Sequence, residues 1–194
     1  MNSKQKGNTY EREIANLFSE KFQDTFRRVP SSGMYTGGKN RFKDNVANLR
    51  SDAQEILSSD IICPAWFPFA IELKHYKSSP NMYSLLRKKK NQIGDADLDK
   101  WLEQAKSDAI FAKKKYLLVF KITGKAEFIA VDYQEFVSTF SGKIPDIYII
   151  YKGSIIIDKD LFLEEYIWDY FTDDKKLLKP TQSNINKDSS SLLQ

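Results

Sequence analysis

The sequence is poor in the residues that build disulfide frameworks and transition-metal sites. Its 194 residues include one cysteine, Cys63, and one histidine, His75. A single cysteine excludes an intrachain disulfide and a multi-cysteine zinc site. A single histidine argues against a His-rich metal site and weakens any Ser-His or Cys-His catalytic pair. We interpret Cys63 as a core residue and His75 as a residue that packs or faces solvent.

Long apolar runs are also missing. No segment approaches the roughly 20 apolar residues that are needed to span a bilayer. The N-terminal stretch MNSKQKGNTYEREIANLF is charged where a signal peptide is apolar. We therefore expect no membrane association and a cytoplasmic, reducing location.

The excess of positive charge is small and unevenly spread. Lys and Arg number 30 against 26 Asp and Glu, which gives a net charge of +4. Residues 1–50 hold ten basic and five acidic side chains, so this segment carries +5 and the remaining residues sum to −1. A polyanionic partner is therefore expected to meet the N-terminal third.

The apolar patterning predicts one α/β domain over residues 1–172, with a core over about 6–131, additions over 132–172 and a polar, disordered tail over 173–194. The expected helices are 9–22, 49–57, 98–112, 133–140 and 160–171. The expected strands are 25–29, 60–63, 69–74, 116–121 and 127–131, followed by a hairpin of 146–151 with 154–157. The first helix is expected to be capped by Asn8 or Thr9 and stopped by Gly7. This order favours a mixed β-sheet flanked by α-helices.

The sharpest chemical signal is Asp60, followed on the next predicted strand by Glu72 and Lys74. Side chains two apart in a strand share a face, so Glu72 and Lys74 point one way while Leu73 and His75 point the other. The short connection between the strands suggests a hairpin, which would bring Asp60 close to Glu72. Two such carboxylates repel each other unless a divalent cation neutralises them, and hard oxygen ligands suit Mg²⁺. The alternative is an ordinary ion pair on a solvated face.

Further motifs occur in a fixed order along the chain. They are KGNTYERE at 6–13, FRRVPSSG at 26–33, SSDII at 58–62, FAIELK at 69–74 and WLEQA at 101–105. Together they resemble the archaeal-type and phage-encoded Holliday junction resolvases of the PD-(D/E)XK nuclease superfamily, over roughly residues 6–121. Ser59 stands where the family usually has proline, and both the loop before Asp60 and the basic insertion over 77–96 are longer.

The resemblance implies a restriction-endonuclease-like fold and hydrolysis of DNA phosphodiester bonds with Mg²⁺, for which Mn²⁺ substitutes. It implies catalytic roles for Glu11, Ser32, Asp60, Glu72, Lys74 and Gln104. Glu11, Asp60, Glu72 and the Leu73 carbonyl would hold the metal. Lys74 would orient or activate the attacking water and offset transition-state charge, and Arg28 would lie beside the scissile phosphate with Ser32. The basic residues expected to contact DNA are Lys6, Arg12, Arg27, Arg28, Lys39, Arg41, Lys43, Arg87, Lys88, Lys89 and Lys90.

Structural alternatives exist for several of these residues. Glu11 can be a first-turn acid that the helix dipole favours, and Ser32 can be an ordinary turn residue beside Gly33. Gln104 can be a solvated helix residue. The basic residues can form a solvated surface. Tyr35 and Trp66 can stack on exposed bases or pack in the core.

Three functional hypotheses remain open at this point. The preferred one is a Mg²⁺-dependent endonuclease acting on branched DNA, above all on Holliday junctions, in recombination or replication. Symmetric cleavage of a junction needs two active sites, so this hypothesis includes a homodimer. The residues Leu161, Phe162, Tyr166, Ile167 and Phe171 of the last helix are either a partner surface or core. The alternatives are a nuclease of the superfamily that acts on flap, duplex or mismatched DNA, and a catalytically inactive DNA-binding relative.

Overall fold

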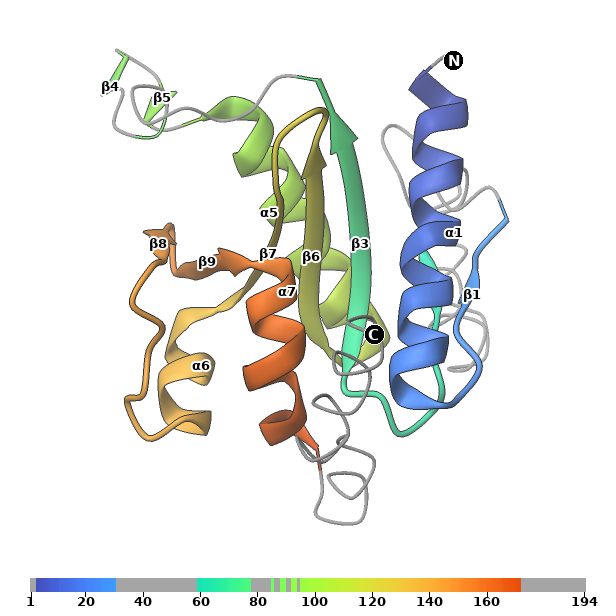
Figure 1. The fold of residues 1–194 in the computed structure, drawn as a ribbon. Coiled ribbons are helices and arrows are strands. Elements are labelled where there is room, and N and C mark those ends of the chain that lie inside the picture. Colours follow the sequence, from blue (N-terminus) through green and yellow to red (C-terminus); the bar gives the residue numbers. More distant parts are fainter. Residues whose placement is uncertain are drawn as a thin grey trace, which may run out of the picture.

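The computed structural model describes residues 3–30, 59–77, 85, 88–89, 92–93 and 95–171. A five-stranded mixed sheet with the order β3-β6-β7-β9-β8 forms its centre (Figure 1). The strands are β3 (Phe69–Tyr76), β6 (Lys115–Ile122), β7 (Glu127–Asp132), β8 (Ile149–Tyr151) and β9 (Ser154–Asp158). Strands β3 and β6 run parallel, and the other pairs are antiparallel. The mixed sheet flanked by helices confirms the predicted fold class.

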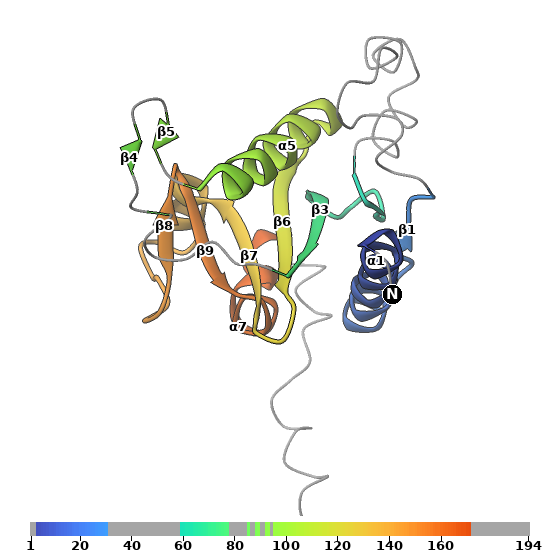
Figure 2. The same ribbon diagram turned by 90° about the horizontal axis from the view of Figure 1, so that it is seen from above.

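Helices cover both faces of this sheet. Helix α5 (Ala96–Ala112) lies over one face, and the C-terminal helical segment lies under the other (Figure 2). That segment joins α7 (Lys159–Leu161), a π-helical turn (Phe162–Tyr166) and a 3₁₀ turn (Ile167–Tyr170). Helices α1 (Ser3–Phe22) and α6 (Tyr133–Thr139) pack on the same side as the C-terminal segment. Because strand side chains alternate between faces, two separate cores result, one under α5 and one under the other helices.

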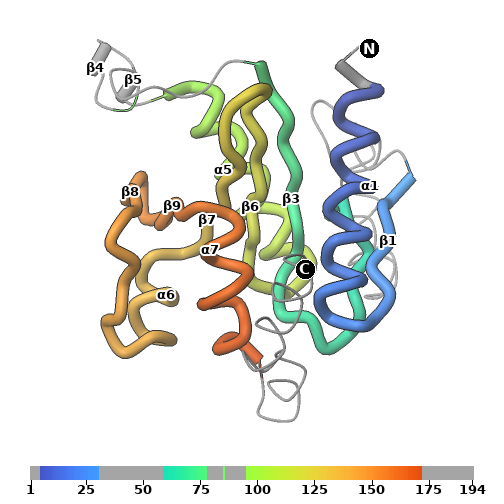
Figure 3. Tube along the Cα trace, in the orientation of Figure 1, coloured from blue at the N-terminus to red at the C-terminus, as the bar shows by residue number. Residues whose placement is uncertain are grey.

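The two outer strands of the sheet face opposite sides of the molecule. Strand β3 is at one edge, with α1 beside it, and β8 is at the other (Figure 3). Two short antiparallel pairs lie outside the main sheet, β1 (Arg27–Arg28) with β2 (Ile61–Ile62) and β4 (Lys88–Lys89) with β5 (Gln92–Ile93). No helix within the described ranges is long and apolar enough to cross a membrane.

The predicted hairpin of residues 60–63 with 69–74 is wrong. Strand β2 pairs with β1 instead. Among the described residues, the backbone–backbone contact with β3 comes from Asp60, just before β2, whose N–H donates to the Ile71 carbonyl at 2.9 Å. The connection between them contains Pro64 and Pro68, which lack N–H donors for a ladder. It also buries Phe67, which packs against other aromatic rings of the core. The connection therefore serves the aromatic core and does not form a tight hairpin turn.

The start of the first helix also differs from the prediction. Helix α1 begins at Ser3 and runs through Gly7, so neither Asn8 nor Thr9 is a cap. Thr9 Oγ1 donates back to the Gln5 carbonyl at 2.9 Å, and Asn8 accepts a hydrogen bond from Arg28. A glycine inside a helix costs about 1 kcal/mol relative to alanine, and α1 continues through Gly7 despite this cost.

The last helix belongs to the core. Phe162, Tyr166, Ile167 and Phe171 are all buried in the cluster under α1, and Leu161 packs against that cluster. These residues are therefore not an exposed partner surface.

Helices at 98–112 and 133–140, the strands at 116–121 and 127–131, and the hairpin of β8 with β9 are confirmed. The predicted helix 49–57 and the tail 173–194 lie outside the described residues.

Candidate active site

The candidate site lies along β3, the edge strand beside α1. Leu73 faces the core under α1, while Ala70 belongs to the core under α5. Lys74 reaches the same side as Ala70, because its Nζ donates to Gln104 Oε1 on α5 at 2.9 Å. The predicted alternation of this strand is therefore present, with Glu72 and Lys74 directed toward α5.

Glu72 and Lys74 form a hydrogen-bonded ion pair in a largely buried setting. Glu72 is 4% exposed, and Lys74 Nζ donates to its Oε1. Burial raises the pKa of Glu72 well above its ordinary value, and the negative charge of Asp60 raises it further while Lys74 opposes both. Burial alone would lower the pKa of Lys74, but Glu72 and Asp60 together hold it above its ordinary value. Lys74 is therefore an ammonium group at neutral pH.

Asp60 is fixed beside this pair by three hydrogen bonds. Its N–H donates to the Ile71 carbonyl and its carbonyl accepts from Val29 N–H, both at 2.9 Å. Its Oδ2 accepts the Leu73 N–H at 2.8 Å. The last bond uses a backbone donor between Glu72 and Lys74, on the edge of β3 that has no neighbouring strand in the five-stranded sheet. Asp60 is thus held against β3 by these bonds, although β2 and β3 form no ladder. The predicted proximity of Asp60 to Glu72 therefore arises without the predicted hairpin.

Glu11 approaches from α1. Arg28 on β1 pairs with the Glu11 carboxylate through Nε, and its Nη2 donates to Asn8 Oδ1 at 2.8 Å. Burial raises the pKa of Glu11, the charge of Asp60 adds to this, and Arg28 and Lys74 act against it. These couplings mean that Glu11 lies within electrostatic range of both Asp60 and Lys74.

The structure therefore brings together side chains from distant parts of the chain: Glu11, Arg28, Asp60, Glu72, Lys74 and Gln104. Each acid is directed at a protein donor: Glu11 at Arg28, Asp60 at the Leu73 N–H and Glu72 at Lys74. Within the described ranges, no three His, Cys, Asp or Glu side chains are grouped as a ready-made metal cluster.

The remaining predicted site residues have different positions. Leu73 lies in β3 with its side chain in the core under α1, Arg27 is exposed on β1, and Lys6 and Arg12 are on α1. The backbones of Lys88 and Lys89 form β4. The other predicted residues lie outside the described ranges: Ser32, Tyr35, Lys39, Arg41, Lys43, Arg87 and Lys90.

The structural interpretations of three other residues hold. Trp66 donates its Nε1–H to Asp24 at 2.7 Å and packs, partly buried, against Phe22, as the packing interpretation predicts. Cys63 packs partly buried against the core. His75 lies 5.5 Å from the Tyr10 ring, centroid to centroid, on the face opposite Lys74.

Two residues of the site are absent from the sequence-based prediction. Asn8 accepts a hydrogen bond from Arg28 Nη2. Its position three residues before Glu11 places it on the same face of the helix, and this spacing could have identified it from the sequence. Asp108 is 5% exposed, lies one turn after Gln104 on α5, and adds to the charges that raise the pKa of Glu72. Its i, i+4 spacing from Gln104 predicts a shared face, but the hydrophobic pattern of the helix does not reveal that an acid is buried there.

A mixed sheet with an acid, a Glu-x-Lys strand and a glutamine at one edge is the arrangement that the resemblance to the PD-(D/E)XK nuclease superfamily leads us to expect. The comparison with family models agrees, because the model described as "Phage putative PDDEXK endonuclease" matches residues 2–177. The chain belongs to this family of phage-associated endonucleases. Searches of curated proteins and of solved structures gave no match.

Proposed function

We propose that this nuclease is a Mg²⁺-dependent endonuclease that cuts branched DNA, with the Holliday junction as its preferred substrate, and that it acts as a homodimer in the cytoplasm of the host cell. One observation carries the catalytic part of the proposal. At one edge of the sheet Lys74 pairs with Glu72, and Asp60 accepts the intervening Leu73 N–H. Glu11 is held next to them by Arg28, which lies opposite Ile61, the residue after Asp60. Mn²⁺ is expected to replace Mg²⁺.

The chemistry of these residues suits a hard divalent cation. Carboxylate and carbonyl oxygens are the protein ligands that Mg²⁺ prefers, and Glu11, Asp60, Glu72 and the Leu73 carbonyl would supply them. A buried carboxylate with a raised pKa is an unfavourable anion, and positive charge close to it removes the penalty. Binding would compete with the present pairs of Glu72 with Lys74 and of Glu11 with Arg28. When bound, the ion would polarise the phosphate and lower the pKa of its water.

The chain's own side chains would do the remaining work. Lys74 would orient the attacking water and, as an ammonium group, offset the charge that develops on the phosphate. Gln104 would hold the Lys74 Nζ in place through its 2.9 Å hydrogen bond. Arg28, which now pairs with Glu11, would meet the phosphate once Glu11 engages the cation.

The choice of a branched substrate rests on the resemblance of the ordered motifs to junction resolvases. The basic residues of the N-terminal third would contact the DNA backbone. Two symmetric cuts in a four-way junction need two active sites, and this requirement supports the homodimer.

The experiment compares wild type with Glu72→Gln on a synthetic four-way junction, a flap and a linear duplex of matched sequence. With Mg²⁺ the wild type is expected to make paired symmetric nicks in the junction, and Glu72→Gln to bind the junction without cutting it. Glu135→Gln is the matched control, because Glu135 pairs with Lys115 on β6, away from the site, and should cut normally. Chelation with EDTA should stop the reaction and Mn²⁺ should restore it.

Other outcomes would replace this proposal. Preferred cutting of the flap or duplex would assign the same chemistry to another DNA substrate. Binding without cutting in Mg²⁺ and in Mn²⁺, together with an Asp60→Asn variant that behaves as wild type, would identify an inactive DNA-binding relative.

A further inference from the structure

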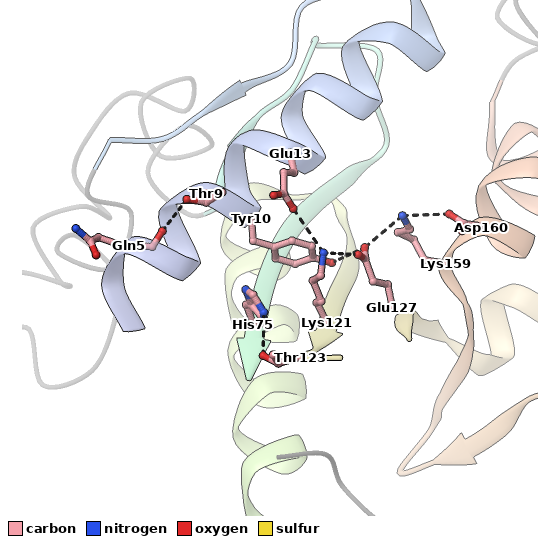
Figure 4. A network of polar contacts seen from close by, with 10 residues as sticks. All are labelled: Gln5, Thr9, Tyr10, Glu13, His75, Lys121, Thr123, Glu127, Lys159 and Asp160. Atoms are coloured by element: carbon pink, nitrogen blue, oxygen red, sulfur yellow. Dashed lines mark hydrogen bonds and ion pairs between the residues drawn. The ribbon is translucent and has the colours of Figure 1, made fainter. Parts of the chain in front are cut away.

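A second polar network lies on the face of the sheet opposite Glu72 and Lys74, and its centre is Glu127 (Figure 4). Glu127 Oε1 lies 2.8 Å from Lys121 Nζ, and its Oε2 lies 3.2 Å from Lys159 Nζ. The Tyr10 hydroxyl donates to the same Oε2 at 3.2 Å. One carboxylate thus joins α1, β6, β7 and α7.

Helix α1 meets this network with one face and the candidate active site with another. Tyr10 and Glu13, three residues apart, both turn toward Lys121; Glu13 Oε2 lies 3.6 Å from Lys121 Nζ, which also lies 5.3 Å from the centre of the Tyr10 ring. Asn8 and Glu11, also three apart, both contact Arg28. Adjacent helical residues differ by about 100° around the axis, so the rotation of α1 sets both faces at once.

We propose that Glu127 is a positioning residue that fixes the rotation of α1 and so keeps Glu11 directed at the active site. Tyr10 is 2% exposed, so its hydroxyl needs a buried acceptor, and Glu127 supplies it. Glu127 is itself fixed by the cross-strand pair with Lys121 and by Lys159, whose side chain is 13% exposed. A turn of α1 in either direction would break the Tyr10 bond and the Glu13 pair together.

The consequence for the active site rests on the proposed function, because it requires Glu11 to bind the cation. A residue that orients a metal ligand through other groups typically changes metal affinity by 10- to 100-fold. Glu127 acts on Glu11 through a helix and not through a direct bond. We therefore expect Glu127→Gln to weaken Mg²⁺ binding by about 3- to 10-fold.

The test uses the full chain and two readouts. Hydrogen exchange without metal is expected to be faster at the amides around Tyr10 and Glu11 in Glu127→Gln than in wild type. Calorimetry is expected to show the weaker Mg²⁺ binding, and saturating Mg²⁺ should restore most of the cleavage rate. Glu135→Gln removes a comparable lysine-paired carboxylate on α6 and should change neither readout.

A second variant keeps the test decisive if Glu127→Gln does not fold. Tyr10→Phe keeps the packed ring and removes only the hydroxyl, and it should reproduce both effects. Tyr116→Phe, which removes a buried hydroxyl bonded to Ser154 at 2.9 Å, is its control.

The two proposals fail in different ways. If wild type cleaves with Mg²⁺ but Glu127→Gln and Tyr10→Phe match their controls in α1 exchange and in Mg²⁺ affinity, the positioning role is refuted and the nuclease proposal stands. If wild type neither binds Mg²⁺ nor cleaves DNA, the proposed function fails, and the exchange data alone decide whether Glu127 holds α1.

Discussion

Replacing Lys74 by glutamine tests whether its ammonium group stabilises both the buried Glu72 and the reaction. The side chains of Lys74 and Glu72 are 17% and 5% exposed, so the variant leaves a nearly buried carboxylate without its cationic partner. Removing one member of a buried ion pair costs about 3–5 kcal/mol of folding free energy. Loss of one charge that stabilises the transition state slows a reaction by about 10²- to 10³-fold.

The stability cost should depend on pH. The pKa of Glu72 is raised by folding, so the metal-free protein loses stability as pH rises from the ordinary value of 4.5 through the raised one. Lys74 opposes that rise, and its removal lets the pKa climb further. At low pH the variant can protonate Glu72 and escape most of the cost, and each pH unit between the pKa of Glu72 in wild type and its higher pKa in the variant widens the stability gap by about 1.4 kcal/mol.

The assay is urea unfolding of wild type and Lys74→Gln at pH 6 and pH 9 without divalent ions. We expect a gap in the unfolding free energy that widens toward about 3 kcal/mol at pH 9 and narrows when Mg²⁺ is added. Lys152→Gln is the control, because Lys152 pairs with Asp99 while 46% exposed and should cost at most about 1 kcal/mol at either pH. An equal gap for Lys74→Gln at both pH values, or unchanged cleavage, would refute this account of the pair.

Three further predictions concern the parts that support the site. Phe22 is fully buried among aromatic rings, and Phe22→Ala should lower the unfolding free energy by about 3–5 kcal/mol in urea titration. Asp95 caps α5 by accepting from the N–H groups of Asp97 and Leu98 at 3.1 Å, so Asp95→Ala should lower the thermal midpoint by an amount equivalent to about 1 kcal/mol. Although burial acts to raise it, Lys121 and Lys159 hold the pKa of Glu127 below 4.5. Its stabilisation is therefore present above that value, and the stability gap between wild type and Glu127→Gln should close as pH falls from 7 to 3.

Elements with strong, local hydrophobic patterns could be predicted from the sequence. The helix at 98–112 has apolar residues at helical spacing, and the strands at 116–121 and 127–131 contain the apolar runs YLLVF and FIAV, as buried strands do. The order of these elements was sufficient for the fold class. The alternation of Glu72 and Lys74 against Leu73 also follows from strand geometry alone.

The rest depends on contacts that no local pattern records. The partner of β2 is decided by tertiary packing, and the sequence separation alone favours the nearer β3 over β1. Glycine is locally unfavourable inside a helix, so the sequence predicts that α1 starts after Gly7, whereas it starts at Ser3. The buried Asp108 and the Glu127 network involve residues far apart in the sequence, and each resembles an ordinary surface charge until the fold places it.

The span of the Tyr10–Glu127 bond, 117 residues, has a consequence for synthesis of the protein. A chain leaves the ribosome from its N-terminus, so α1 emerges first, while Glu127 and then Lys159 follow much later. Under the proposed positioning role, Glu11 lacks the support of the Glu127 network until nearly the whole domain is outside the ribosome. A product truncated before Lys159 would carry all the acids of the site with Glu11 less firmly oriented, so we expect it to bind Mg²⁺ more weakly than the complete domain.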